Sequence, residues 1–285
     1  MADMIYKKPD SLEEALDFLA RNGERTEILA GGTDVMVDLK AGDLPHKTVL
    51  MDISRLAPLR QIEFNGHKLT LGAGVTLAEI QRSDLVQTHA PALAACAETF
   101  AGKQIRNKAT IGGNVAHASP CGDTIPPLVI YDARALVATR TTERLVPVDE
   151  IAAGPYQSSL PPDALIVKFV LTPRQTDFVD FQKIGRRKAL AIARMSLAVM
   201  ADRDAAGAIS FVRVGLGACT PTPHRMGDLE SFLTGKVPTL PVLREAGELL
   251  SRKMIEITGR RASIVYKEPA VQGLLMRILY PLVQS

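Results

Sequence analysis

The chain has 285 residues, a formal net charge of +3, and 46% hydrophobic against 23% charged residues. This length gives room for two domains that each bury a core, and the balance of apolar and charged residues excludes a disordered chain. The small net charge and the absence of Trp argue against a nucleic-acid partner. No apolar run reaches the length of a membrane span and no secretory leader is visible, so the sequence predicts a cytoplasmic protein.

Cysteine usage excludes a cluster or structural zinc on this chain. Cys96, Cys121 and Cys219 are widely separated and too few to supply four thiolates, and their odd number argues against a disulfide scaffold. The five histidines form no H-E-x-x-H pattern. We therefore expect any iron–sulfur cluster to lie on a partner and no metal site here.

The first third of the chain predicts a β-α-β unit. Residues 10–21 predict a helix with Ser11 as N-cap and acidic residues in its first turn. Residues 26–30 then predict a strand, 34–40 a helix and 48–53 a second strand.

The middle of the chain predicts short strands and helices. The expected elements are strands at 62–64 and 68–74, a helix opened by a Thr76–Glu79 capping box, a helix over 91–101, a strand-loop-strand over 104–120, a turn at Pro126-Pro127, and strands at 134–139 and 164–171. The helix over 91–101 brings Phe100 to the edge of a Gly-rich segment.

Prolines up to Pro173 place a domain boundary near residue 175. We expect a domain over 1–175, with subdomains of about 1–55 and 56–175, and a second domain over 176–285. Beyond the boundary, the expected strands lie at 178–184, 197–202 and 210–217 and the helices near 225–234, 241–257 and 264–281; residues 192–195 fit either a helix or a strand. Strands followed by helices indicate an α+β fold.

Two Gly-Gly loops carry the main functional signal. The first spans Ile28 to Val35, and the second contains Thr110 to Asn114. Because glycine has no Cβ, backbone N–H groups at such loops can approach a diphosphate closely, and nearby hydroxyls and amides add hydrogen bonds. Either loop alone is also consistent with a tight turn, and neither has the G-x-G-x-x-G or P-loop spacing.

Three motifs in this order resemble a known family. They are Ala30-Gly31-Gly32-Thr33-Asp34, Thr110-Ile111-Gly112-Gly113-Asn114 and Ser119-Pro120-x-x-Asp123. They resemble the FAD-binding (medium) subunit or domain of the xanthine dehydrogenase and carbon monoxide dehydrogenase (molybdenum hydroxylase) family, and the similarity covers nearly the whole chain. The resemblance implies a two-part FAD-binding domain of the vanillyl-alcohol-oxidase (PCMH) type, and a small C-terminal α+β domain of antiparallel sheet and helices.

The resemblance and the loop chemistry together give a set of candidate FAD-binding residues. These are Ile28, Leu29, Ala30, Gly31, Gly32, Thr33, Asp34, Val35, Phe100, Thr110, Ile111, Gly112, Gly113, Asn114, Ser119, Asp123, Ile166 and Lys188. We expect N–H groups of 30–34 and 111–114 to hold the diphosphate, and Asp123 to accept from ribityl or ribose hydroxyls. We expect Phe100 to stack on the flavin ring. A turn residue and a core aromatic are the structural alternatives for Asp123 and Phe100.

The sequence departs from the animal relatives after Arg186-Arg187. Those enzymes have a Glu-Asp-Asp run where this chain has Lys188-Ala189-Leu190. The local field near the flavin should therefore be more positive, which puts NAD as acceptor in doubt.

The resemblance implies an electron-transfer role without a catalytic acid or base on this chain. Electrons would pass from two-iron two-sulfur clusters on a small partner subunit to non-covalent FAD here, and then to NAD, a quinone or a carrier. The molybdenum cofactor would lie on a large partner subunit, in a dimer of heterotrimers. The alternatives are a self-sufficient flavin oxidase or dehydrogenase of the vanillyl-alcohol-oxidase type, and a flavin-free interaction subunit.

Overall fold

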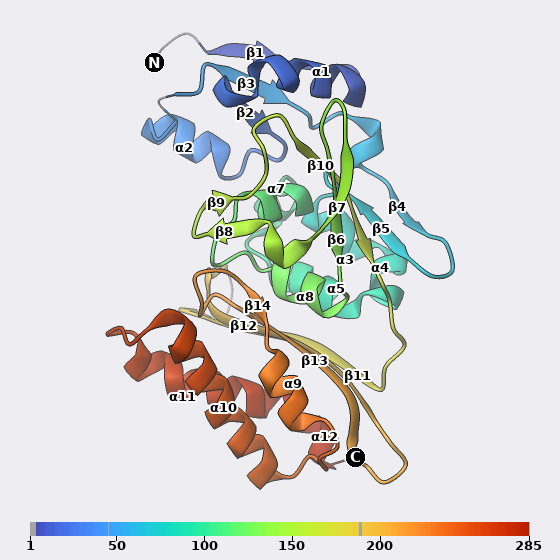
Figure 1. Ribbon diagram of the computed structural model, residues 1–285, viewed down its shortest axis with the longest axis vertical. Helices are drawn as coiled ribbons and strands as arrows, with labels where there is room; N and C mark the ends of the chain where they lie inside the picture. The colour runs from blue at the N-terminus through green and yellow to red at the C-terminus, as the bar shows by residue number, and fades with distance from the viewer. Residues whose placement is uncertain (1–3, 45, 188–189, 285) are drawn as a thin grey trace.

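The computed structural model describes residues 4–44, 46–187 and 190–284 (Figure 1). Three layered units follow one another along the long axis, each built on its own sheet (Figure 1). The first unit lies at the N-terminal end, the second in the middle, and the third carries the long C-terminal helices. Lys188 lies outside the described residues.

The first unit is a parallel three-stranded sheet with order β1-β3-β2. Its elements are β1 (Ile5–Lys7), α1 (Leu12–Asn22), β2 (Thr26–Leu29), α2 (Val35–Ala41) and β3 (Val49–Asp52). The Ser11 hydroxyl accepts a hydrogen bond from the backbone N–H of Glu14, as a helix N-cap should. The expected β-α-β unit is confirmed, and it places the first Gly-Gly loop at the carboxyl end of β2.

The second unit is a five-stranded antiparallel sheet, ordered β4-β5-β10-β6-β7, with helices packed against it. Its strands are β4 (Ile62–Phe64), β5 (Leu69–Gly72), β6 (Arg134–Ala138), β7 (Glu143–Pro147) and β10 (Leu165–Leu171). Its helices are α3 (Leu77–Arg82), α4 (Asp84–His89), α5 (Pro91–Thr99), α6 (Lys103–Arg106), α7 (Ile111–Ala116) and α8 (Ile125–Ile130). A small hairpin of β8 (Ala152–Gly154) and β9 (Gln157–Ser158) completes it.

Two sequence predictions in this unit are wrong. Residues 104–120 contain helices α6 and α7 instead of strand, loop and strand. The Thr110 hydroxyl caps α7 by accepting from Gly113 N–H at 3.1 Å, and the cap offsets the low helix propensity of the two glycines. Pro126 and Pro127 lie in the first turn of α8, where a missing N–H costs nothing, and do not form a separate turn.

The third unit is an antiparallel sheet of order β11-β12-β13-β14, followed by helices. The elements are β11 (Phe178–Gly185), β12 (Ala193–Arg203), β13 (Ile209–Gly217), β14 (His224–Arg225), α9 (Gly227–Leu233), α10 (Leu240–Thr258), α11 (Ile264–Leu279) and α12 (Pro281–Gln284). Of the ambiguous residues 192–195, those from Ala193 onward form the start of strand β12, and Ile192 precedes it. Within the described residues, no helix combines the length and apolar character needed to cross a membrane.

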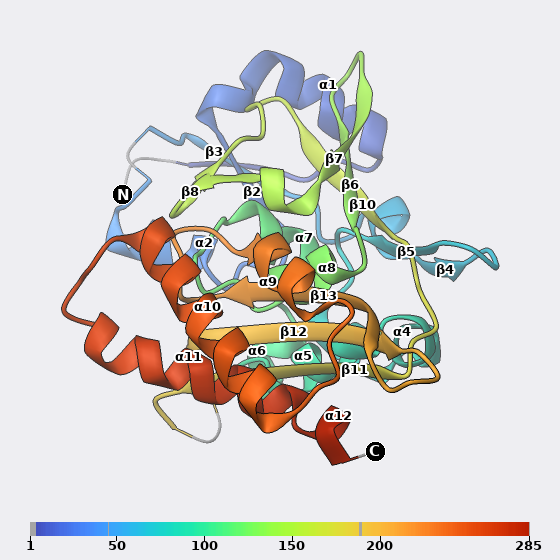
Figure 2. The same cartoon turned by 60° about the horizontal axis from the view of Figure 1, so that its bottom comes forward.

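The third sheet is buried on both faces. Helices α9 and α11 contact one face and α10 packs against both of them, while α5 and α8 of the second unit pack on the other face (Figure 2). The approach is close because β13 presents glycines to α8: a Cβ on Gly215 would lie 2.5 Å from the Pro126 carbonyl oxygen. Phe181 and Met200 of this sheet belong to the same apolar cluster as the core of the second unit. The second and third units therefore share a core.

Candidate cofactor-binding site

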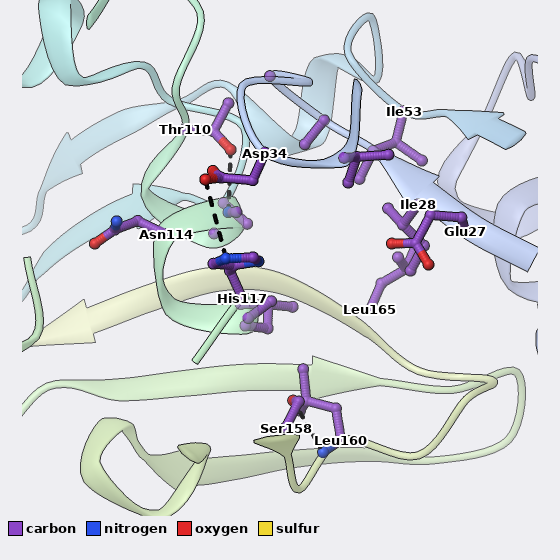
Figure 3. A pocket seen from close by; sticks show the side chains of 18 of the residues that line it. Glu27, Ile28, Asp34, Ile53, Thr110, Asn114, His117, Ser158, Leu160 and Leu165 are labelled. Atoms are coloured by element: carbon purple, nitrogen blue, oxygen red, sulfur yellow. Dashed lines mark hydrogen bonds and ion pairs between the residues drawn. The ribbon is translucent and has the colours of Figure 1, made fainter. Parts of the chain in front are cut away.

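A cleft between the first and second units brings the two Gly-Gly loops together (Figure 3). Its volume is about 290 Å³. The expected site residues that line it are Ile28, Ala30, Gly31, Gly32, Thr33, Asp34, Val35, Phe100, Thr110, Gly112, Gly113, Asn114 and Ile166. Residues from the segment after β9, including Leu160, form a further part of the wall (Figure 3).

The first loop connects β2 to α2 and keeps free hydrogen-bond donors. No backbone N–H of Gly31, Gly32, Thr33 or Asp34 donates to another residue in the part of the chain that the structure describes. A Cβ on Gly31 would lie 2.0 Å from the Lys108 carbonyl oxygen, so only glycine allows this loop to lie against the segment before α7. Gly32 has φ +74°, a left-handed conformation that also favours glycine. The loop therefore offers a row of N–H groups suited to an anion.

The second loop differs because its donors are already used. Ile111 N–H donates to Val75 O at 3.0 Å, and Gly112 N–H to Ala73 O at 2.8 Å. The Gly113 N–H donates to the Thr110 hydroxyl. A diphosphate contact from 111–113, as expected from the sequence, would require these groups to exchange partners. The first loop is the better donor.

Phe100 and Ile166 supply apolar surface to the cleft. Phe100 follows α5 directly and is half-buried, and Ile166 on β10 is 6% exposed. The Arg106 guanidinium donates to the carbonyl oxygens of Phe100 and Ala101 at 2.9 and 3.0 Å, which fixes the turn after α5. Phe100 is thus an aromatic side chain with part of its surface free for a planar ligand.

Four expected residues do not line this cleft. Leu29 borders a neighbouring surface cavity, Ile111 is fully buried in the core, and the Ser119 hydroxyl accepts from the N–H of Cys121. Asp123 lies at the junction of the second and third units, where it is 5% exposed.

Asp123 is nonetheless incompletely paired. Its Oδ2 accepts from the Lys183 ammonium at 2.7 Å, whereas no group among the described residues bonds its buried Oδ1. Burial raises the pKa of Asp123, and the Lys183 charge opposes this shift. A buried carboxylate oxygen without a partner is costly, so a hydroxyl donor from a ligand would stabilise it.

The cleft also contains polar residues that the sequence did not single out for binding. His117 on the C-terminal side of α7 lies with Nε2 3.9 Å from Asp34 Oδ1, which links the two loops across the cleft (Figure 3). Glu27 and Lys47 also line the cleft, and burial raises the pKa of Glu27. A charged residue inside an otherwise apolar strand was the available signal for Glu27. His117 had no comparable signal, because the five histidines form no H-E-x-x-H pattern.

Burial raises the pKa of all three cysteine thiols, which disfavours a reactive thiolate. Cys96 and Cys219 are buried, and burial raises the pKa of Cys219 to about 12. Within the described ranges, no group of three His, Cys, Asp or Glu side chains converges as a metal site would require.

Comparison with known proteins identifies the family. Residues 2–174 match the family described as "FAD binding domain in molybdopterin dehydrogenase", and residues 180–282 match "CO dehydrogenase flavoprotein C-terminal domain". The chain is 30% identical to the xanthine dehydrogenase FAD-binding subunit of Escherichia coli O157:H7, over 96% of this chain and 94% of that one. It is 29% identical to the nicotine 6-hydroxylase medium subunit of Paenarthrobacter nicotinovorans, over 96% and 95%.

A solved structure of carbon monoxide dehydrogenase from Hydrogenophaga pseudoflava has the same fold. The TM-score is 0.90 and the identity 26%, with 97% of this chain and 96% of that chain covered. The two-loop cleft thus belongs to a fold that these flavoproteins share. The chain belongs to the FAD-binding medium subunits of the xanthine dehydrogenase and carbon monoxide dehydrogenase type of molybdenum hydroxylase, whose molybdenum cofactor and iron–sulfur clusters lie on other subunits.

Proposed function

We propose that this chain holds one FAD non-covalently in the cleft and passes electrons from two-iron two-sulfur clusters on a small partner subunit to an external acceptor. The observation that carries the proposal is the first loop, whose N–H groups remain free at the wall of a cleft that also contains Phe100. A large partner subunit would hold the molybdenum cofactor and hydroxylate the substrate. When bound, FAD accepts electrons one at a time from the clusters and passes them to the acceptor.

The residues of this chain bind and orient the cofactor. Free N–H groups of Gly31 to Asp34 would neutralise part of the diphosphate charge, and Thr110 and Asn114 line the facing wall. Phe100 would contact the flavin ring. The unpartnered Oδ1 of Asp123 would accept from a ligand hydroxyl once the cofactor reaches the junction of the second and third units. Ser119, Ile166 and Lys188 remain proposed contacts.

The wider organisation follows from the same proposal. We divide the chain near residue 175, because β10 ends at Leu171 and β11 begins at Phe178. The small subunit would dock beside Phe100 and the second Gly-Gly loop, so that its clusters approach the exposed edge of the flavin. The complex would be a dimer of heterotrimers, and its location in the cytoplasm stays a prediction.

Electron delivery to the flavin tests this function. The chain is co-expressed with the small and large subunits of its complex, and flavin reduction is followed by rapid mixing with the substrate of the complex or with a chemical reductant of the clusters. We expect the Phe100→Ala complex to assemble but to show slower flavin reduction or lower FAD occupancy, because ring packing worth about 0.5–1.5 kcal/mol is lost. Phe64→Ala, on β4 in contact with His89, is the matched control. If the chain co-expressed with these subunits purified without any iron or molybdenum protein, the result would contradict the proposal.

A further inference from the structure

We propose that a basic surface on the third unit docks an acidic redox carrier protein, which accepts the electrons of the flavin. This inference rests on the proposed function and selects a carrier protein from the acceptors that the sequence leaves open. We call the surface the arginine patch. Its members are the apolar side chains Leu190, Ile192, Val265 and Tyr266 and the basic side chains Arg186, Arg187, Arg194, Arg260 and Arg261.

The centre of the arginine patch is apolar and unusually exposed. Ile192 is 77% exposed and Val265 85%, and Leu190 and Tyr266 are 59% and 45% exposed. These residues come from the segment before β12 and from the first turn of α11. The Arg194 guanidinium lies 5.5 Å from the centre of the Tyr266 ring and so connects the two segments. Large apolar side chains that are exposed on two segments joined by such a contact are typical of an interaction surface.

The two segments that carry the arginine patch contain basic residues and no acidic ones. Neither residues 186–194 nor residues 260–266 contain Asp or Glu, although the whole chain has a net charge of only +3. Within the described residues, none of the five arginines forms an ion pair with a carboxylate. Arg187 instead donates to the Leu190 carbonyl oxygen at 2.6 and 3.1 Å. Unpaired arginines around an apolar centre complement a surface that carries carboxylates.

The mixture of charge and apolar surface favours a transient partner. Permanent subunit interfaces are large and depleted of charged residues at their centre. In the arginine patch, by contrast, arginines are interleaved with the apolar side chains. Electron-transfer encounters are small and guided by opposite charges, and exposed arginines beside apolar side chains suit an encounter of this kind.

The arginine patch also reaches the candidate flavin site. Leu190 packs against Gly102: a Cβ on Gly102 would lie 3.2 Å from Leu190 Cδ2. Gly102 is two residues from Phe100, in the turn that Arg106 holds. A carrier docked here would therefore approach the proposed flavin ring from the third unit, whereas the small subunit is proposed to dock beside the second Gly-Gly loop. Reduced FAD would give one electron to each of two carrier molecules in succession and release its protons to water.

Binding without turnover is the direct test. Flavodoxin, an acidic carrier, is titrated into the oxidised full-length protein by calorimetry at low ionic strength, with basic cytochrome c as comparison. In Arg186→Glu/Arg187→Glu we expect the Kd for flavodoxin to rise by about tenfold or more, because opposite charges that guide association are removed. Arg134→Glu/Arg144→Glu, on exposed positions of β6 and β7, makes the same change of net charge elsewhere. We expect that control to bind as the wild type does.

Reoxidation of the flavin supplies the second readout. The dithionite-reduced protein should pass electrons to flavodoxin at a rate that falls with rising salt and falls about tenfold in the patch variant. Equal losses in the control variant, or tighter binding of cytochrome c than of flavodoxin, would overturn the inference. So would failure of the patch variant to assemble with the iron–sulfur subunit while it still binds flavodoxin. Absence of FAD would instead refute the proposed function, since the titration does not require flavin.

Discussion

The glycines of the two loops have different roles, which the structure separates. Gly31 and Gly112 allow close packing, because a Cβ on either would meet backbone atoms of a neighbouring segment. Gly32 supplies a positive φ. A Cβ on Gly113 would approach only one atom closely, the Thr110 hydroxyl oxygen at 3.0 Å, and no backbone atom. Gly113 is therefore the position at which a substitution tests ligand approach with the smallest change to the fold.

We expect Gly113→Ala to fold and to bind FAD about tenfold more weakly, which corresponds to about 1.4 kcal/mol. The added methyl group occupies space in the cleft that the ligand would use, and it pushes against the Thr110 hydroxyl that caps α7. Fluorescence titration with FAD measures the change. Gly273→Ala, at an open position on α11, is the control and should keep wild-type affinity. Equal affinities of all three proteins for FAD would remove Gly113 from the site.

Glu27 gives the cleft a pH-dependent contribution to stability. Burial raises its pKa in the folded protein above the ordinary value of 4.5, with Lys47 opposing the shift. The folded state then binds the proton more tightly than the unfolded state, so stability falls as pH rises from about 4.5 through the folded pKa.

We expect Glu27→Gln to be more stable than the wild type at neutral pH and to lose this advantage below about pH 4.5, where Glu27 is protonated in both states. Denaturant unfolding at a series of pH values measures it. Glu63→Gln, at an exposed position on β4, is the matched control. A difference between Glu27→Gln and the wild type that stays constant with pH would show that the carboxyl charge is not responsible.

At the scale of elements, the sequence predicted those with strong local signals. The Ser11 cap, the Thr76–Glu79 capping box and the alternation in β11 each mark an element by nearby residues, and all three elements form. Helix α7 was missed because two glycines disfavour a helix locally, while its stability comes from Thr110 and from packing on Ala73. Helix α8 was missed because its two prolines resemble a turn.

The candidate site was predictable only in part for a related reason. Motifs identified both loops and Phe100, which the fold brings to one cleft. They could not show that the N–H groups of 111–113 are already bonded, nor that Asp123 is paired with Lys183 from 60 residues later. His117 and Glu27 enter the cleft through tertiary packing alone.

The contact between α8 and β13 gives a prediction for these elements. In Gly215→Ala the new Cβ would lie 2.5 Å from the Pro126 carbonyl oxygen, a backbone atom that cannot move without shifting α8. We expect the free energy of unfolding to fall by about 1–3 kcal/mol, as for an overpacked core. Ser210→Ala, at an exposed position on the same strand, should change stability little. An unaltered denaturation midpoint for Gly215→Ala would contradict this packing.

At the scale of the whole molecule, the three units have different roles. The first and second units form the cleft between the Gly-Gly loops, and the third closes the far side of the second unit through a shared core. Asp132 adds a polar contact at that junction, because it pairs with Arg225 of the third unit. The third unit also carries the arginine patch. The proposed carrier-docking surface thus adjoins the proposed cofactor contacts, and the two meet at the turn after Phe100.

The central claim is that this chain alone holds FAD without a covalent bond. The most direct measurement is to purify the full chain expressed by itself, precipitate it with acid, and identify and quantify the flavin in the supernatant and the pellet. We expect FAD in the supernatant, at about one molecule per chain. Flavin that stays with the pellet would show a covalent link of the kind found in self-sufficient oxidases, and a colourless chain that binds no added FAD would contradict the claim.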